Sequence, residues 1–390
     1  MRPVTGAPRV GMAGGGQLSR MTAAPAAALG IGFRVLATSP EESAAQVVAD
    51  VTLGHHDDLD ALTRLAAHCD VITFDHEHVP PAHLRALEGM GVAVRPGPQA
   101  LVHAQDKIAM RSALTEAGLP SPRWAPVKYA SDLSSVGGTL GWPMVLKVSR
   151  GGYDGRGVWV VSSADEAARV MAETTLVPGA AWLAEEFVPF TRELAAQVAR
   201  SPSGQAVAYP VVRTVQVDGM CSEVVAPCPD LPEDRAVEAQ ELALQVARRL
   251  DVTGMLAVEL FDTGDRLLVN ELAMRPHNSG HWSIDGAVTS QFENHLRAVL
   301  DLPLGDPRPI ARWTVMVNVV GPRDADSLPP LYDAYRHLMA RDPGLKIHLY
   351  GKEVRPGRKL GHVTVVSDDL ESALMRAHHA ADYLMGAIDE

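Results

Sequence analysis

The sequence is poor in cysteine, carries no excess of positive charge and contains no long apolar run. Its three cysteines, Cys69, Cys221 and Cys228, match no zinc-binding spacing, and an odd, sparse count does not make a disulfide framework. We therefore expect a reducing, cytoplasmic compartment. The longest apolar stretch, residues 23–33, is short and contains Pro25, so we expect no membrane span.

The shortage of positive charge limits the kinds of partner. A formal net charge of -12 argues against a surface that binds nucleic acid or an anionic membrane. Anionic small molecules would need cations gathered locally. Hydrophobic residues make up 46% and charged residues 21% of the 390 residues, which is typical of a folded globular protein with several domains.

The order of strand and helix patterns divides the chain into blocks. Strand patterns at 9–13, 33–37, 71–74 and 92–94 alternate with helix patterns, which predicts an N-terminal βαβ domain. A Pro- and Gly-containing boundary follows at 95–107. Beyond it, strands at 181–190 and 192–200, joined by tight turns, indicate an antiparallel α+β lid. Further predictions are helices at 164–175, 232–250 and 369–385, and a strand–turn–strand at 254–276.

The segment "GGYDGRG", residues 151–157, lies between two strand patterns, so it is not a Walker A loop. A flexible loop of this kind can fold over a polyphosphate, and Lys147 on the preceding strand can reach the same oxygens. An ordinary mobile hairpin is the alternative. The Tyr, Asp and Arg inside the loop favour the binding interpretation.

Two carboxylates stand out in the strand–turn–strand. If residues 263–265 form the loop, Glu259 lies opposite Val269, and Glu271 is its diagonal neighbour on the same face, about 7–8 Å away. Carboxylates so close repel unless a cation lies between them. Mg²⁺ held by carboxylates and substrate phosphates meets this need, with Asn270 as a nearby neutral oxygen. Two solvated carboxylates on an edge hairpin are the alternative.

The N-terminal glycine turn, "GMAGGGQLSRM", follows a strand and opens a helix, a place where main-chain N–H groups bind anions. A dinucleotide site would need an acidic residue at the end of the second strand, where the sequence has Ala37, Thr38 and Ser39. NAD is therefore disfavoured. Close packing of helix on strand is the alternative role of these glycines.

Three further segments have polar patterns. "EEFVPF" (185–190) with Glu193 can offer main-chain groups to adenine and a carboxylate to ribose, or form a plain core strand. "RPHNSGHW" (275–282) has two histidines four apart, but Pro276 and Gly280 favour a polar substrate loop over a helical zinc site. "YGKEVRPGRKLGH" (350–362) is a basic turn that suits a phosphate monoester, or a solvated loop.

Taken in order, "GGGQL", "GGYDGRG", "EEFV", "VELF…VNELAMRPHNSGHW" and "GKEVRPGRKLGH" cover nearly the whole chain. Together they resemble the N5-carboxyaminoimidazole ribonucleotide synthetase family of ATP-grasp enzymes in purine biosynthesis. The resemblance implies an α/β and α+β architecture with four parts. These are a βαβ pre-ATP-grasp domain at 1–104, a lid at 105–188, a central domain with the metal site at 189–310, and a C-terminal subdomain at 311–390 that closes the substrate-phosphate site.

The resemblance also implies an activity. It is ATP- and bicarbonate-dependent carboxylation of 5-aminoimidazole ribonucleotide through carboxyphosphate, with Mg²⁺ or Mn²⁺ as the metal. The implied partners are these small molecules and a second copy of the chain in a homodimer, with no nucleic acid and no membrane.

Individual site residues follow from the resemblance alone. The implied metal ligands are Glu259 and Glu271, and the implied catalytic residues are Asp154, Arg156, Arg275 and Asn278. The implied ATP contacts are Lys107, Lys147, Gly151, Gly152, Tyr153, Gly155, Gly157, Glu185, Glu186, Phe187, Val188, Glu193, Gln216, Asn270 and Glu271. The implied ribonucleotide contacts are Gly15, Gln17, Leu18, Glu77, Tyr153, Asp154, Arg275, His277, Ser279, Lys352, Arg358 and Lys359.

Four positions depart from the pattern usual in that family: Ser19, Asp75, His78 and Gln216. Two other functions remain open. One is another ATP-grasp ligase that forms an acyl phosphate, such as a formate-dependent glycinamide ribonucleotide transformylase or a biotin carboxylase. The other is a nucleotide-binding regulatory module without catalysis, which the retained Lys147, Glu259 and Glu271 disfavour.

Overall fold

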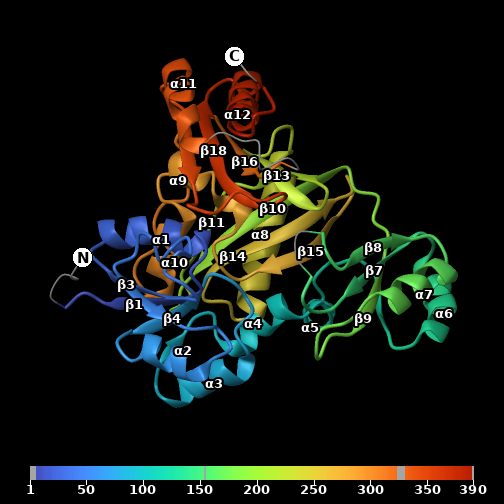
Figure 1. The fold of residues 1–390 in the computed structure, drawn as a ribbon. Helices are drawn as coiled ribbons and strands as arrows, with labels where there is room; N and C mark the ends of the chain where they lie inside the picture. The colour runs from blue at the N-terminus through green and yellow to red at the C-terminus, as the bar shows by residue number, and fades with distance from the viewer. Residues whose placement is uncertain (1–5, 153–154, 323–329, 389–390) are drawn as a thin grey trace.

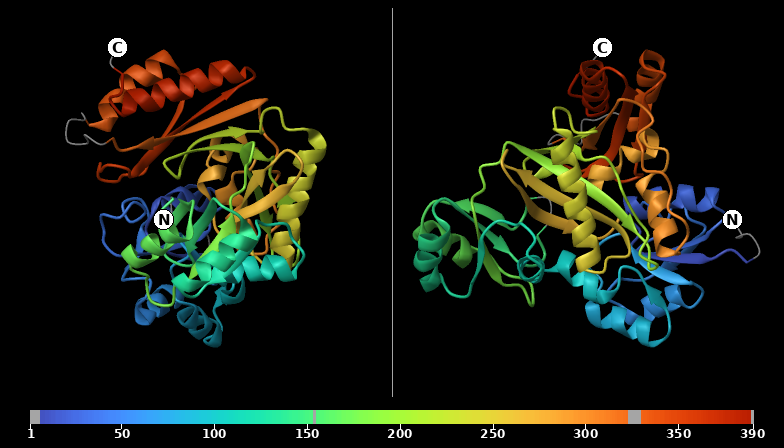
Figure 2. Two further views of the ribbon diagram at one scale, coloured as in Figure 1. Left: turned by 90° about the vertical axis from the view of Figure 1, so that its right-hand side faces the viewer. Right: turned by 180° about the vertical axis from the view of Figure 1, so that it is seen from behind.

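The computed structural model describes residues 6–152, 155–322 and 330–388, and its strands form three sheets (Figure 1). The N-terminal part lies at the lower left of Figure 1, the lid at the right, and the C-terminal part at the top, with the central strands between them. The right-hand view in Figure 2 shows the same separation of the lid from the N-terminal part. None of the described helices combines the length and the apolar composition that a membrane span requires.

The N-terminal sheet is parallel throughout, as the alternating pattern predicts. Its strand order is β3-β2-β1-β4-β5, with bounds β1 Arg9–Ala13, β2 Gly32–Ala37, β3 Asp50–Leu53, β4 Val71–Phe74 and β5 Ala93–Val94. The accompanying helices are α1 Gln17–Ala28, α2 Leu59–Ala66, α3 Pro81–Gly89 and α4 Pro98–Gln105. The glycine turn therefore lies at the carboxyl end of β1, where parallel sheets bind ligands.

A connecting helix, α5 (Lys107–Glu116), leads into the lid. It begins after Asp106 because that carboxylate accepts hydrogen bonds from the main-chain N–H groups of Ile108 and Ala109. The lid is an antiparallel sheet in the order β6-β9-β7-β8, which confirms the predicted α+β character. Its elements are β6 Trp124–Val127, η1 Ala130–Asp132, α6 Leu133–Leu140, β7 Met144–Val148, β8 Val158–Val161, α7 Ala164–Glu173 and β9 Trp182–Glu186.

A nine-stranded sheet holds the rest of the chain, in the order β15-β14-β10-β12-β13-β16-β18-β17, with β11 paired to β10. The strands are β10 Arg192–Arg200, β11 Ala206–Ala208, β12 Val212–Val217, β13 Met220–Ala226, β14 Gly254–Asp262, β15 Leu267–Ala273, β16 Trp313–Val320, β17 Lys346–Leu349 and β18 Lys359–Ser367. The helices are α8 Glu233–Arg249, η2 Asn278–Gly280, α9 Ser283–Gly286, α10 Gln291–Val299, η4 Leu331–Asp333, α11 Ala334–Arg341 and α12 Leu370–Leu384.

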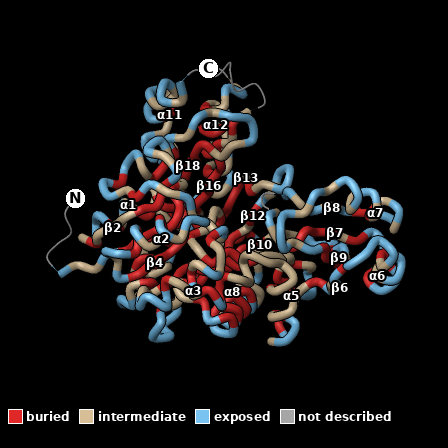
Figure 3. The backbone as a smooth tube through the Cα atoms, turned by 60° about the horizontal axis from the view of Figure 1, so that its bottom comes forward, coloured by how far each residue is buried: buried red, intermediate tan, exposed pale blue. Residues whose placement is uncertain are grey.

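This large sheet crosses the boundary expected near residue 311, because β16 pairs with β13 of the central part. The central and C-terminal parts therefore share one hydrogen-bonded framework, and the four domain limits remain predictions. Figure 3 shows buried backbone concentrated in the strands and in α8. Helix α8 has acidic residues in its first turn and arginines in its last, which suits the helix dipole, and it buries Ala239, Leu242, Ala243, Val246 and Ala247.

The register predicted for the β14–β15 hairpin is wrong. Glu259 pairs directly with Glu271, whereas the next pair is Leu260 with Val269, so a β-bulge leaves Asn270 as the extra residue. Val269 is consequently buried in the hydrophobic core, and it does not share a face with Glu271 as predicted. Alternation alone could not reveal the bulge, because one inserted residue reverses the faces of all residues beyond it.

Candidate active site

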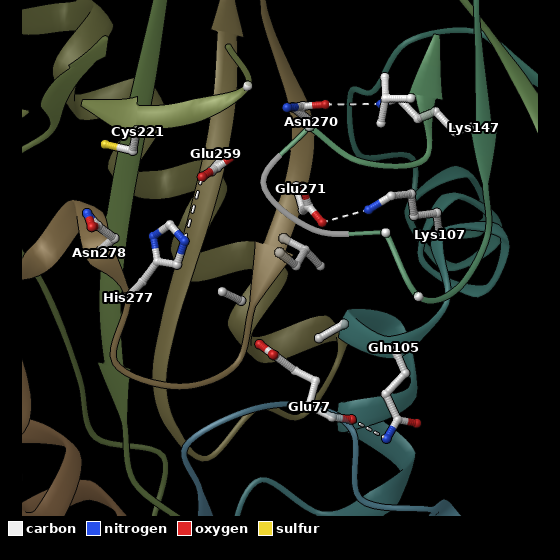
Figure 4. Close-up of a pocket in the computed structure, with 18 of the residues that line it drawn as sticks. Glu77, Gln105, Lys107, Lys147, Cys221, Glu259, Asn270, Glu271, His277 and Asn278 are labelled. Atoms are coloured by element: carbon white, nitrogen blue, oxygen red, sulfur yellow. Dashed lines mark hydrogen bonds and ion pairs between the residues drawn. The ribbon is translucent and has the colours of Figure 1, made fainter. Parts of the chain in front are cut away.

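A cleft of about 1010 Å³ is lined by residues from the N-terminal part, the lid and the central sheet. Figure 4 shows how the side chains approach it: Lys147 and Lys107 come from the side of the lid and α5, and His277 comes from the opposite side. The strands β14 and β15 lie between them and carry the acidic groups. Cations and carboxylates from distant parts of the chain thus meet in one space.

The two carboxylates predicted as metal ligands both line this cleft. The Lys107 Nζ lies 2.6 Å from Glu271 Oε1, and His277 Nε2 lies 3.7 Å from Glu259 Oε1. Burial and the neighbouring Glu271 raise the pKa of Glu259 to about 8. Burial also acts to raise the pKa of Glu271, but the Lys107 ammonium outweighs it and lowers that pKa below its ordinary value.

This donor set fits a hard divalent cation. Carboxylate oxygens, with the Asn270 amide oxygen beside them, are the ligands that Mg²⁺ prefers, and Mg²⁺ characteristically takes its remaining ligands from water and substrate phosphates. Within the described residues, no group of three or more His, Cys, Asp or Glu side chains could hold a metal on its own. Two carboxylates and one amide oxygen leave positions on such an ion for water or phosphate oxygens.

A buried ionic network lies beside the carboxylate pair. Glu185 accepts from Lys147 Nζ and from Arg111 Nε, both at 2.7 Å, and its side chain is 2% exposed. Burial acts to raise the pKa of Glu185, but the Lys147 and Arg111 cations lower it to about 2. Lys147 also donates to Asn270 Oδ1 at 3.4 Å. The lid lysine is thus held at the bulge by fixed partners.

The glycine turn differs from an open anion site. Asp75 accepts hydrogen bonds from the main-chain N–H of Gly16 at 2.6 Å and of Ser19 at 3.0 Å. The Ser19 hydroxyl donates to the Gly14 carbonyl at 2.6 Å. The protein's own carboxylate therefore accepts from two of the N–H groups at the start of α1, those of Gly16 and Ser19. The contacts predicted at Gly15, Gln17 and Leu18 remain predictions. Ser19 and Asp75, both departures from the family pattern, thus meet at this turn through the Ser19 main-chain N–H and the Asp75 carboxylate.

The wall of the cleft opposite the lid carries the "RPHNSGHW" segment, which is a loop with a short 3₁₀ turn, as predicted. Arg275 Nε pairs with Glu77 Oε1 at 2.8 Å. Burial and the Arg275 cation lower the pKa of His277 to about 3, so its imidazole is neutral. Ser279 is buried behind it and lies 2.9 Å from His277 Nδ1. The Asn278 Oδ1 accepts from Asn318 Nδ2 at 2.9 Å.

The basic turn reaches the N-terminal part. Lys352 Nζ donates to Gln17 Oε1, and Gln17 itself lines the cleft. Arg358 Nη1 donates to the Glu353 carbonyl at 3.3 Å, and Lys359 lines the cleft. Of the cations predicted in this turn, only Lys359 therefore lines the cleft, and Lys352 is linked to it through Gln17. The phosphate site remains a prediction.

The structure brings most of the predicted site residues to the cleft. Those lining it are Gln17, Leu18, Glu77, Lys107, Lys147, Gly151, Gly152, Gly155, Glu185, Glu186, Phe187, Val188, Glu193, Gln216, Glu259, Asn270, Glu271, Arg275, His277, Asn278 and Lys359. Those described but not lining it are Gly15, Arg156, Gly157, Ser279, Lys352 and Arg358. Gly15 lines a smaller neighbouring cavity of about 280 Å³. Tyr153 and Asp154 lie outside the described residues.

Sequence reasoning missed several residues of the site. His76, Gln105 and Arg150 line the cleft, and Arg111 lies directly behind it. The sequence contained one indication of Arg111. It follows Lys107 by four residues in a helix, so the two side chains lie on the same helical face. The others sit in loops or at helix ends, where no periodicity indicates a direction.

Family profiles match three successive parts of the chain. They are described as "Ribonucleotide synthetase preATP-grasp domain" over 8–105, "ATP-grasp domain" over 112–292 and "Phosphoribosylaminoimidazole carboxylase C-terminal domain" over 314–376. The antiparallel lid, the cleft beneath it and the paired carboxylates accordingly define an ATP-grasp enzyme.

Individual relatives narrow this class. The chain is 54% identical to the N5-carboxyaminoimidazole ribonucleotide synthase of Mycobacterium tuberculosis, over 97% of this chain and 88% of the relative. A solved N5-carboxyaminoimidazole ribonucleotide synthetase with ADP has a TM-score of 0.88 and 33% identity, and covers 99% of each chain. An Aspergillus clavatus N5-carboxyaminoimidazole synthase with ADP and 5-aminoimidazole ribonucleotide has a TM-score of 0.88 and 31% identity, over 99% of this chain and 100% of that one. The chain belongs to the N5-carboxyaminoimidazole ribonucleotide synthase family.

Proposed function

We propose that this protein uses ATP and bicarbonate to carboxylate 5-aminoimidazole ribonucleotide, forming N5-carboxyaminoimidazole ribonucleotide, ADP and phosphate for purine biosynthesis. Family membership supports this reaction. The structural observation that carries it is the direct pairing of Glu259 with Glu271, both facing one cleft that also receives Lys107. Such a site is suited to phosphoryl transfer, where positioning and charge neutralisation dominate catalysis.

ATP lies between the lid and the large sheet in this proposal. Lys107, Lys147 and the loop at 151–157 contact its phosphates, and Glu193 contacts its ribose. The Glu185 carboxylate is already held by two cations, so adenine recognition falls to main-chain groups of residues 185–188. Glu186, Phe187 and Gln216 complete the predicted nucleotide contacts and lie on the cleft wall.

Glu259 and Glu271, with Asn270 beside them, hold Mg²⁺ or Mn²⁺ in the proposed complex. The bound ion would neutralise the negative charge that develops on the transferring phosphoryl group. The Lys107 ammonium pairs with Glu271 in the structure. In the proposed complex it binds a phosphate oxygen of ATP, because Glu271 then binds the metal ion.

The acceptor side of the cleft handles bicarbonate and the ribonucleotide. A bicarbonate oxygen attacks the terminal phosphorus of ATP, and ADP leaves, which gives carboxyphosphate. The exocyclic amine of the ribonucleotide then bonds to the carboxyl carbon as phosphate leaves, and the amine nitrogen loses one proton. We assign Arg275, Asn278, Asp154 and Arg156 to this acceptor chemistry. Closure of the lid excludes water, which would hydrolyse the mixed anhydride.

The ribonucleotide spans the N-terminal turn, the 275–282 segment and the basic turn. Its contacts in the proposal are Gly15, Gln17, Leu18, Glu77, Tyr153, Asp154, Arg275, His277, Ser279, Lys352, Arg358 and Lys359. Lys352 and Arg358 take the 5′-phosphate because Arg and Lys bind phosphate oxygens through charge-assisted hydrogen bonds. A homodimer in a reducing cytoplasm completes the proposal, and the three cysteines are free thiols.

The test is a coupled assay of ADP release with 5-aminoimidazole ribonucleotide, in the presence and absence of bicarbonate. We expect turnover that requires both, with N5-carboxyaminoimidazole ribonucleotide as product. Stimulation by formate in place of bicarbonate would instead assign the protein to another acyl-phosphate ligase. Tight ATP binding without turnover under any acceptor would contradict an enzymatic role.

A further inference from the structure

Arg111 lies in α5 between the lid and the large sheet, and its side chain is fully buried. Its guanidinium makes three hydrogen bonds in different directions. Nε donates to Glu185 in lid strand β9 at 2.7 Å, Nη1 to the Val269 carbonyl at 2.9 Å, and Nη2 to the Asn270 carbonyl at 2.8 Å. One side chain therefore joins the connecting helix, the lid and the edge strand of the large sheet.

The two carbonyl groups that Arg111 binds belong to the β-bulge. Strand β15 is an edge strand, so the side of it that faces away from β14 has no neighbouring strand of the same sheet. The segment after α5 covers that side, because the Val269 N–H donates to the Pro120 carbonyl at 2.9 Å. Arg111 satisfies the adjacent carbonyl groups, including that of the extra residue, Asn270. Buried carbonyl groups need such partners, and a bulge without them would be free to relax into regular pairing.

We propose that Arg111 is a positioning residue, which fixes the bulge that turns Glu271 toward Glu259 and at the same time fixes the lid lysine Lys147. The inference rests on the proposed magnesium site. Without the bulge, Asn270 would pair with Glu259, and strand alternation would turn Glu271 to the opposite face of the sheet. The link to Lys147 runs through Glu185, whose second oxygen holds the Lys147 ammonium at 2.7 Å.

The planar guanidinium is essential to this arrangement. It presents several donors in a fixed fork, whereas a lysine ammonium is a compact point charge at the end of a flexible chain. Arg111→Lys retains the buried positive charge beside Glu185 but cannot bridge the carboxylate and both carbonyl groups in the same geometry. The substitution therefore tests the hydrogen-bonding geometry of Arg111 while it keeps the positive charge.

The experiment measures the dissociation constant of ADP by calorimetry, with and without Mg²⁺, for the unaltered protein and for Arg111→Lys. We expect Mg²⁺ to tighten ADP binding in the unaltered protein. In Arg111→Lys, this Mg²⁺-dependent gain falls about tenfold to a hundredfold, the range found when partners that orient metal ligands are lost. ADP binding without the metal stays close to that of the unaltered protein.

Arg200→Lys is the matched control. Arg200 Nη1 also bridges a carboxylate and a carbonyl group, Asp251 Oδ1 and the Val252 oxygen, both at 2.9 Å, and it does not line the cleft. It should retain the full Mg²⁺-dependent gain. Equal gains in Arg111→Lys and Arg200→Lys would overturn the inference. Absence of any gain in the unaltered protein would instead overturn the proposed metal site, and the inference with it.

A second measurement needs no variant and covers the case in which Arg111→Lys does not fold. Amide hydrogen exchange of residues 267–273 is followed in the unaltered protein with and without Mg²⁺ and ADP. Ligand binding slows exchange through global unfolding in every strand of the large sheet, so β10 (Arg192–Arg200) serves as the internal reference. A bulge already fixed by Arg111 predicts that residues 267–273 slow by the same factor as β10. Slowing of residues 267–273 that exceeds the slowing of β10 by more than about tenfold would show an unformed bulge and overturn the inference.

Discussion

At the scale of single residues, Asp75 provides the hydrogen-bond acceptor that the N-terminal glycine turn needs. Its carboxylate accepts from the N–H groups of Gly16 and Ser19, so the positive end of α1 is already neutralised. A Cβ atom at Gly16 would lie 2.1 Å from Asp75 Oδ2, which explains why the turn has glycine there. The proposed contacts of Gln17 and Leu18 with the ribonucleotide would then come from a turn whose shape Asp75 fixes.

The first prediction concerns this contact. Asp75→Ala leaves two buried main-chain N–H groups without an acceptor, and we expect a loss of about 1–3 kcal/mol in the free energy of unfolding. Asp75→Asn keeps one acceptor oxygen and should lose less. Denaturant unfolding of both variants provides the measurement, and equal midpoints for Asp75→Ala and the unaltered protein would contradict it.

The second prediction concerns the carboxylate pair. Glu271→Gln removes one of the two carboxylates that hold the metal ion in the proposed reaction. That ion neutralises the charge on the transferring phosphoryl group. We expect kcat to fall by about a hundredfold or more, which is the usual effect of losing one electrostatic contact to a transition state. Glu238→Gln, on the exposed side of α8, is the control. Unchanged turnover in Glu271→Gln would remove this residue from the site.

At the scale of elements, the β14–β15 hairpin shows where sequence reasoning succeeds and where it stops. The strand pair and its two acidic side chains were predictable from alternation. The loop was predicted one residue too short, because Asp262 pairs with Leu267 and leaves residues 263–266 in the turn. The bulge was not predictable, because it depends on contacts with Arg111 and Pro120, which are distant in the sequence. The two carboxylates therefore reach the same cleft, but the predicted register between them is wrong.

Other elements follow the same division. The predicted strand at 192–200 agrees with β10, and the predicted helix at 232–250 with α8, since each has a strong period of its own. The assignment of 192–200 to the lid was wrong, because β10 pairs with β14 and β12 in the large sheet. The strand predicted at 181–190 ends at Glu186, because beyond it the chain leaves the lid sheet. Joining of β16 to β13 could not be predicted, since no local pattern specifies which strand edge a later strand will meet.

The third prediction concerns the docking of α12 on the large sheet. His378 Nε2 lies 2.7 Å from Glu223 Oε2 on β13. The hydrogen bond to Glu223 raises the pKa of His378 above its ordinary value of 6.5. A base with a raised pKa in the folded state stabilises the fold fully below pH 6.5, and this contribution disappears as the pH rises through the raised pKa.

The matching experiment compares His378→Gln with the unaltered protein across this pH range. The histidine is about half exposed, so we expect a stability difference below about 1 kcal/mol at acidic pH. The difference should vanish in alkaline solution. A difference that is the same at every pH would show that packing, and not the ionised pair, accounts for it.

At the scale of the whole molecule, three sheets converge on one cleft, and the lid approaches the large sheet at more than one point. Besides the Arg111 contacts, Gly155 lies against the turn between β12 and β13. It has a φ of +75°, and a Cβ atom there would come within 2.9 Å of the Gly219 Cα. Only glycine accommodates both the backbone angle and this approach. A ligand in the cleft therefore contacts parts of the chain that fold as separate sheets.

The fourth prediction follows from that convergence. Magnesium and ATP together should raise the melting temperature, with a stabilisation of about 2.7 kcal/mol when ATP is present at a hundred times its dissociation constant. GTP offers the same phosphates but a different base edge to residues 185–188, so its effect at equal concentration should be smaller. Equal shifts for both nucleotides in a thermal unfolding assay would contradict adenine recognition by the main chain.

The continuous large sheet has one further consequence. Glu271 lies on its edge strand and Lys359 opens β18, and an unbroken series of main-chain hydrogen bonds joins these two strands. The large sheet therefore sets the distance between the acidic pair, Glu259 and Glu271, and Lys359, and the lid sheet does not contribute to it. In the proposed complex, a substrate with a longer or shorter reach would therefore lose its contact either with the metal at the acidic pair or with Lys359.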